Sequence, residues 1–258
     1  MIKIIKYDFL KKYKLISVIL ITAVLLNLLL IIKFNVKGSG AFLGLFPLGM
    51  LLLYIVDIIK MYGDDLNKKS GYMLFMTPIS GYKIIISKVT TAILELLFIL
   101  ILYFVFILIN ASYISIKQGY DVPIGDIFTA INIVLSGSLG FNLGHVFVIL
   151  LAALILAISF ILTVYTSITI RKSIFAEIKY GGILSFIIFI ILNWILSYTS
   201  GKLMSVLSPY YDNIINAGTN ITATQLVYIL LPVIVLSAFE SILLTLGSGY
   251  LLENKINL

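Results

Sequence analysis

Long apolar runs alternate with short polar segments along this chain. Because about 20 helical residues span the hydrocarbon core of a bilayer, six runs are long enough to cross it: residues 15–32, 41–59, 84–109, 145–170, 181–197 and 226–247. A backbone exposed to lipid must satisfy its own hydrogen bonds, which a helix does within one segment. The pattern therefore predicts an all-α, polytopic membrane protein with six transmembrane helices in a single domain, residues 1–258.

Charged residues are scarce and unevenly placed. The 258-residue chain is 61% hydrophobic and 11% charged, whereas soluble domains carry about 25% charged residues. With the N-terminus in the cytoplasm, fourteen basic residues fall on cytoplasmic segments and four on the other side. Cytoplasmic loops are enriched in lysine and arginine, so we expect both termini inside. The net charge of +7 then reflects topology, and we expect no nucleic-acid partner. One arginine against seventeen lysines, together with abundant isoleucine and asparagine, suggests an AT-rich bacterial genome, so we expect the chain in a bacterial cytoplasmic membrane.

Residues 1–14 precede the first run and are amphipathic. Apolar residues recur at three- and four-residue spacing, and most lysines lie off that stripe: Ile2, Ile5, Phe9, Tyr13 and Ile16 against Lys3, Lys6, Lys11 and Lys14. The pattern predicts a helix on the inner leaflet with its lysines toward anionic headgroups. An orientation signal without fixed structure is the alternative.

The polar connections differ in length. Residues 34–40 are few and include glycine, which predicts a tight hairpin. Residues 60–88 form a compact charged segment on the cytoplasmic side. Residues 110–144 and 198–225 are longer and predicted to be external. The first would contain a short interfacial helix at 127–135, and the second a re-entrant or interfacial element around Tyr210 and Tyr211, since aromatic side chains favour the membrane interface.

The chain carries no pattern for chemistry of its own. It has no G-x-x-x-x-G-K-[ST] loop for nucleotide phosphates. It also has no cysteine and a single histidine, His145, which leaves no credible metal site. We therefore expect no catalytic residues, and no cofactor or metal bound by this chain.

The segment DLNKKSGYMLFMTPISGYK at residues 65–83, which continues into IIISK, resembles the loop between helices two and three of ABC-2 type transporter permeases. A charged residue, a glycine, a short helix rich in leucine and methionine, a Thr-Pro pair and a lysine opening the next helix follow in the same order. The layout of six spans after a basic amphipathic start is also similar. Small permeases of this family include exporters in phenol-soluble modulin, lantibiotic and bacitracin-type systems.

The resemblance implies that residues 60–83 hold a coupling helix that seats in a groove of a separate ATPase. Asp64 or Asp65 would cap this helix and Pro78 would end it, because the residue before a proline disfavours helical geometry. The residues assigned to ATPase coupling are Asp64, Asp65, Lys68, Lys69, Tyr72, Met73, Phe75, Met76, Thr77 and Pro78, with Glu177 as a minor contact. The alternatives are a solvated loop that binds headgroups and, for Glu177, ordinary topogenic charge.

Polar residues inside the predicted spans form a second group. A central ionisable group costs about 2.5–3.5 kcal/mol on insertion scales, so it should face protein or water. One hypothesis is that these residues line a translocation path, and the alternative is hydrogen bonding that holds helices together. Asp57, near the end of its span, is expected at the interface. The path candidates are Asn27, Glu95, Asn193 and Glu240.

The sequence thus predicts the membrane permease subunit of an ATP-driven ABC exporter, which moves an amphipathic or lipophilic cargo such as a peptide. Six helices make half of a translocation path, so the expected partners are a second permease copy or a similar permease and two ATPase copies, which hold the ATP and magnesium. Membrane lipids and the cargo complete the set. A proton-coupled secondary transporter and a membrane anchor or sensor without transport are the other hypotheses. The cargo and the direction of transport stay open.

Overall fold

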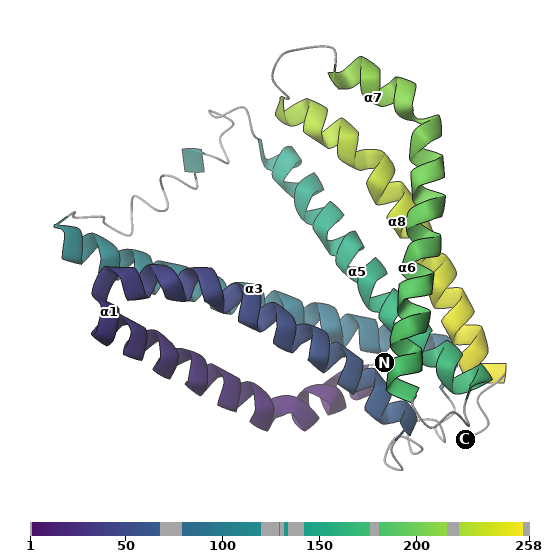
Figure 1. Cartoon of the computed structure of the whole chain (residues 1–258), viewed down its shortest axis with the longest axis horizontal. Helices are drawn as coiled ribbons and strands as arrows, with labels where there is room; N and C mark the ends of the chain where they lie inside the picture. The colour runs from purple at the N-terminus through teal and green to yellow at the C-terminus, as the bar shows by residue number, and fades with distance from the viewer. Residues whose placement is uncertain are drawn as a thin grey trace. The chain divides into compact units, whose positions relative to one another are not determined.

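A computed structural model describes residues 2–67, 79–119, 129, 132–133, 142–175, 181–215 and 222–254. The regular structure of these residues is helical (Figure 1). Five of the described helices are long and apolar enough to cross a membrane. The prediction of an all-helical chain with several such helices is confirmed, whereas six spans and cytoplasmic termini stay predictions. The helices are α1 (Ile2–Asn67), α3 (Gly81–Gln118), α5 (Leu143–Ile174), α6 (Gly181–Val206), the short α7 (Ser208–Ile215) and α8 (Ala223–Asn254).

Helix α1 consists of two arms joined at Asn35, where φ is 51° (Figure 1). Positive φ is uncommon outside glycine, and asparagine is among the residues that tolerate it best. Lys12 of the first arm contacts Asp57 of the second, so the arms run antiparallel. The predicted tight hairpin is confirmed, and each arm contains one of the predicted spans.

Close backbone approach stabilises this hairpin. A Cβ atom at Gly38 would lie 1.9 Å from the carbonyl oxygen of Leu30, so only glycine fits there. Beside it, the Ser39 hydroxyl donates a hydrogen bond of 2.6 Å to Asn110 Oδ1, and Asn110 is fully buried. The bend of α1 is thereby tied to α3.

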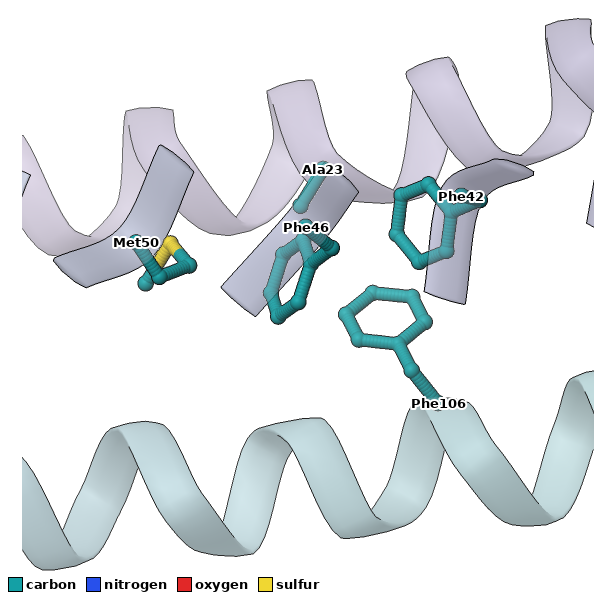
Figure 2. Packing of buried hydrophobic residues seen from close by; sticks show 5 residues of the cluster. All are labelled: Ala23, Phe42, Phe46, Met50 and Phe106. Carbon is teal, nitrogen blue, oxygen red and sulfur yellow. The ribbon is translucent and has the colours of Figure 1, made fainter. Parts of the chain in front are cut away.

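The contacts divide the chain into two units, Met1–Met61 with Thr90–Ile131 and Tyr62–Val89 with Asn132–Leu258. The core of the first unit is aromatic and lies between the arms of α1 and α3 (Figure 2). The Phe42 ring stacks on Phe46 and meets Phe106 edge-on, with ring centroids 5.0 Å apart in both cases. Aromatic pairs favour these offset and edge-on geometries. Ala23 and Met50 complete the cluster.

The second unit is built on α5 and α8, which pack side by side in parallel. His145 Nε2 lies 3.4 Å from Thr224 Oγ1 at their N-terminal ends, and Thr166 Oγ1 lies 3.5 Å from the Leu244 carbonyl oxygen further along. Buried serines of α8, among them Ser248, let the two backbones approach. Helix α6 packs mainly on α5.

The two helix starts of this pair are capped in the same way. Asn142 and His145 form a reciprocal capping box at α5. At α8 the Thr222 N–H donates to Gln225 Oε1, and the Gln225 N–H donates to the Thr222 hydroxyl. Each box satisfies amide groups that the first helical turn leaves open. His145 therefore has a structural role at a helix start.

The structure corrects several predicted boundaries. Helix α6 continues to Val206 and does not end at residue 197, and α7 then folds back so that its Tyr211 hydroxyl lies 3.4 Å from the Ile229 carbonyl oxygen of α8. Apolar runs mark only the hydrocarbon-spanning part of a helix, and polar residues extend these helices beyond it. The interfacial helix predicted at 127–135 lies almost entirely outside the described residues.

Residues 2–34 form one uninterrupted arm, so no break separates the amphipathic start from the first span. The face of this start that packs on protein carries Ile4, Asp8 and Lys12, whereas Ile2 and Tyr13 of the apolar stripe are exposed. In a membrane protein the apolar side of a helix can face lipid while polar groups turn inward. A location on the inner leaflet stays a prediction.

We predict that Gly38→Ala destabilises the hairpin. The new methyl group would collide with the Leu30 carbonyl, and overpacking of this kind typically costs about 1–3 kcal/mol. Gly40→Ala is the matched control, because a Cβ there has open space. Thermal unfolding of the purified chain in detergent should show a clearly lower midpoint for Gly38→Ala and an unchanged midpoint for Gly40→Ala. Equal midpoints for the two variants would contradict the packing described for Gly38.

Candidate functional site

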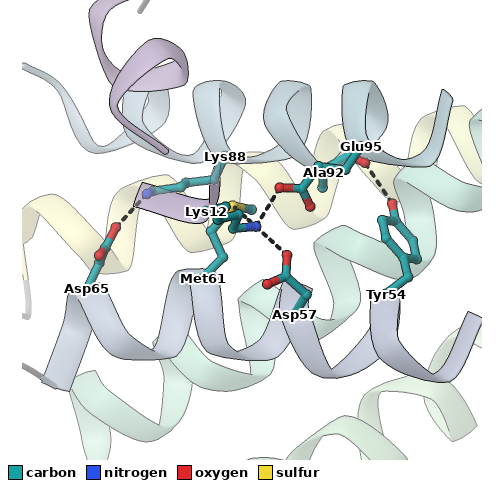
Figure 3. Close-up of polar contacts among 8 residues, drawn as sticks. All are labelled: Lys12, Tyr54, Asp57, Met61, Asp65, Lys88, Ala92 and Glu95. Carbon is teal, nitrogen blue, oxygen red and sulfur yellow. Dashed lines mark hydrogen bonds and ion pairs between the residues drawn. The ribbon is translucent and has the colours of Figure 1, made fainter. Parts of the chain in front are cut away.

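The two stems of the polar loop are joined by a buried ion pair. Lys88 Nζ, in the first turns of α3, lies 2.5 Å from Asp65 Oδ2, in the last turns of α1 (Figure 3). The exposed fractions of the two side chains are 1% and 8%. Removing one partner of such a pair leaves a charge buried without its counter-ion, which is strongly destabilising. This pair therefore holds together the two helix ends from which the loop emerges.

Each stem is also fixed to the C-terminal end of a helix in the second unit. Arg171 Nη1, in the last turn of α5, donates a 2.8 Å hydrogen bond to Asn67 Oδ1 at the end of α1. The Gly81 N–H, at the start of α3, donates a 2.8 Å hydrogen bond to Glu253 Oε1 near the end of α8. A carboxylate at a helix N-terminus also interacts favourably with the helix dipole.

Tight packing supports these polar contacts. The Tyr62 ring stacks on Tyr165 with centroids 4.5 Å apart, and its hydroxyl lies 2.6 Å from Thr169 Oγ1. On the other stem, the Tyr82 ring covers Gly249 so closely that a Cβ there would lie 2.2 Å from the ring. Movement of either stem would therefore act directly on the ends of α5 and α8.

Two of the residues assigned to ATPase coupling, Asp64 and Asp65, belong to the described part of the chain. Lys68, Lys69, Tyr72, Met73, Phe75, Met76, Thr77, Pro78 and Glu177 lie outside the described residues. Asp64 and Asp65 lie inside α1, so neither occupies the non-helical N-cap position that was expected of them. Helix α1 extends further into the polar segment than the apolar pattern predicted. Asp65 forms the stem ion pair, and the coupling role of the loop stays a prediction.

The first unit contains a second charged cluster. Lys12 Nζ contacts Asp57 Oδ2 and lies 2.5 Å from Glu95 Oε1 (Figure 3). Met61 Sδ is 3.3 Å from the same ammonium. The cluster brings together both arms of α1 and α3. Nearby, the Tyr54 hydroxyl donates a 2.9 Å hydrogen bond to the Ala92 carbonyl.

Sequence reasoning missed Lys12 and gave Asp57 no partner. Lys12 was counted with the cytoplasmic lysines, yet it is buried in this cluster. The sequence signal that could have identified Lys12 is its spacing from other residues of the first helix. Lys12 follows Ile4 and Asp8 at four-residue intervals, which places the three residues on one face of a helix.

The other residues proposed for a translocation path have different surroundings. Glu240 Oε1 accepts a 2.5 Å hydrogen bond from the Ser200 hydroxyl, whereas Asn193 donates to the carbonyl of Phe189 in its own helix. Asn27 is buried, and its Oδ1 has no hydrogen-bond partner among the described residues. Asn27 and Glu95 belong to the first unit, Asn193 and Glu240 to the second. Their role in transport stays a prediction.

Within the residues that the structure describes, no three histidine, cysteine or acidic side chains are grouped so as to hold a metal ion. Comparison with protein-family models, curated proteins and solved structures found no match to the chain.

We predict that Lys88→Met lowers the free energy of unfolding by about 3–5 kcal/mol, the usual cost of breaking a buried pair. Lys83→Met is the matched control, since Lys83 lies on the same helix and is exposed, and surface changes usually stay within about 0.5 kcal/mol. The double variant Asp65→Leu/Lys88→Met should lose much less than the sum of its single changes. Chemical denaturation in detergent measures all four variants. Equal losses for Lys88→Met and Lys83→Met would contradict the buried pair.

Proposed function

We propose that this chain is the membrane permease subunit of an ATP-driven exporter of the ABC-2 type. The observation that carries the proposal is the construction of the loop stems. The segment that resembles an ATPase-coupling loop is closed by the Asp65–Lys88 pair and fixed to the ends of α5 and α8. A loop that receives force from a partner needs such attachments to pass it on.

The arrangement of helix ends in the second unit supports the predicted topology. Asn67, Gly81, Arg171 and Glu253, all predicted to be cytoplasmic, meet at one end of the unit. His145 and Thr224, both predicted to be external, meet at the N-terminal ends of α5 and α8. Six spans with both termini in the cytoplasm require this alternation, with the two arms of α1 as the first two spans.

The proposed mechanism follows from these attachments. Two ATPase copies, which hold ATP and magnesium, bind the loop of this chain and of a second permease copy or a similar permease. Closure of the ATPase dimer pushes the loop, and the stems carry the displacement to α5 and α8. The helices then tilt and change access to the path between the permeases. The cargo is amphipathic or lipophilic, with a peptide as the first candidate.

A proton-coupled secondary transporter is the second candidate, and the Lys12–Asp57–Glu95 cluster is the observation that favours it. Charged groups inside membrane-spanning helices often mark ion or proton pathways. The two candidates differ in their energy source. Uptake of the cargo into inverted vesicles that requires ATP and persists with an uncoupler supports the exporter. Uptake that persists without ATP and stops with an uncoupler supports the secondary transporter.

We predict that the chain co-purifies with an ATPase that has its own P-loop. The affinity-tagged chain is purified from cells that naturally produce it, and bound proteins are identified by mass spectrometry. Phe75→Ala should weaken the complex about thirtyfold, since a buried hot spot typically contributes about 2 kcal/mol or more. Met73→Asp should abolish it, while Lys117→Ala, on the predicted external side, should leave it intact. Recovery of the ATPase in undiminished amount with both loop variants would exclude docking at this loop.

The predicted topology can be tested without background, because the chain has no cysteine. Single cysteines replacing Lys37, Lys117 or Lys202 should react with an impermeant maleimide in intact cells. Cysteines replacing Lys68, Lys172 or Lys255 should react only after permeabilisation. Labelling of position 172 from outside would mean that residues 110–144 contain a further span, and the six-span layout would be wrong.

A further inference from the structure

The charged cluster of the first unit has two carboxyl groups for one cation. Lys12 is the sole basic side chain within ion-pair distance of Asp57 or Glu95 among the described residues. If all three groups were ionised, the cluster would carry one net negative charge inside helices that can span a membrane. Such a charge is costly to keep away from water, so the composition of the cluster calls for one more positive charge.

The geometry indicates where that charge lies. The Asp57 and Glu95 carboxyl groups both contact the Lys12 Nζ atom, which brings them close to each other. An ionised carboxylate has only acceptor atoms, so two ionised groups cannot share a hydrogen bond. Two neighbouring carboxyl groups in a protein interior commonly bind one proton between them. A single proton would form a hydrogen bond between the two carboxyl groups. The same proton would also neutralise the cluster.

Among the described residues, the polar groups next to the cluster have other partners. The Tyr54 hydroxyl is used by the Ala92 carbonyl, and Met61 sulfur faces the Lys12 ammonium. Asp8 lies one turn before Lys12, is buried, and has interactions of its own. The Glu95 side chain is 9% exposed against 23% for Asp57. Burial favours the neutral form of a carboxyl group, so the proton binds more favourably to Glu95 than to Asp57.

We propose that Asp57 and Glu95 share one bound proton beside Lys12, which makes this cluster a proton-binding site within the membrane-spanning helices. The proton resides on Glu95, and Asp57 keeps the charge that pairs with Lys12. Because the members come from both arms of α1 and from α3, binding or release of the proton changes the attraction that holds these three segments together. Proton binding at this site does not require an ATPase partner. The proposal can therefore be tested separately from the proposed exporter function.

Infrared spectroscopy of the purified chain tests the proposal, because a protonated carboxyl group has a carbonyl band that shifts in heavy water. The detergent must lack carbonyl groups, and all variants carry Glu240→Gln to remove the carboxyl that faces Ser200. At slightly acidic pH, where surface carboxylates are ionised, the cluster should give one such band. Asp8→Asn should leave this band in place.

The distinguishing result is that Glu95→Gln and Asp57→Asn each remove the same band. In either variant one carboxylate faces one ammonium, so no extra proton is needed. Lys12→Met should instead increase the band, since two carboxyl groups without a cation both take up protons. A band that survives Asp57→Asn or Glu95→Gln would overturn the shared proton. If a variant does not fold, a pH titration of the Glu240→Gln parent tests the proposal instead. The carbonyl band should vanish in one step as the pH rises. Absence of the band at acidic pH would also overturn the proposal.

Discussion

A polar group inside a membrane-spanning helix must find its partner within the protein, and this constraint explains most of the contacts that fix these helices. Lipid offers no hydrogen bonds, so the backbone is helical. Many serine and threonine hydroxyls, such as those of Thr163 and Ser241, donate to the carbonyl four residues before them. Charged groups cannot be satisfied locally, and they join helices that are distant in sequence. Lys12 and Lys88 do so in the two units.

The need to pair polar groups within the protein also explains how the polar loop is attached to the helices. Asp65 and Lys88 could have been placed in water, where an ion pair contributes little to stability. Their burial at the loop stems links the positions of the two helix ends. Arg171 and Glu253 extend that link to α5 and α8. A partner that binds the loop would therefore act on helices rather than on a loosely attached segment, which is the physical basis of the proposed permease.

The sequence predicted the helical class, the approximate place of the long helices that the structure describes and a hairpin within residues 34–40, because apolar runs and short glycine-containing connections report these features directly. It did not predict where the helices end, as the extension of α6 to Val206 shows. It also missed the partner of Glu95. Hydrophobic patterning identifies the residues that avoid water, but pairing depends on which helices pack together. Lys12 therefore resembled its exposed neighbours Lys11 and Lys14 until the fold placed it against α3.

The expectation that Asp65 caps a coupling helix failed for a related reason. A capping role for Asp64 or Asp65 was inferred from the order of residues in the loop, whereas the structure places both residues inside α1. Residues that carry the resemblance to ABC-2 permeases are mostly outside the described part of the chain. The stems are described, and they are what the structure adds to the functional argument.

The most direct test of this account is disulfide cross-linking of a stem to α8. In the cysteine-free chain, Tyr82→Cys and Gly249→Cys place two thiols where the Tyr82 ring now covers Gly249. Mild oxidation in native membranes should cross-link this pair efficiently, because disulfides form only between closely opposed Cβ atoms. The pair Tyr82→Cys and Gly247→Cys should not react, since a Cβ at position 247 has open space. Equal cross-linking of both pairs, or of neither, would contradict the attachment of the loop stem to α8.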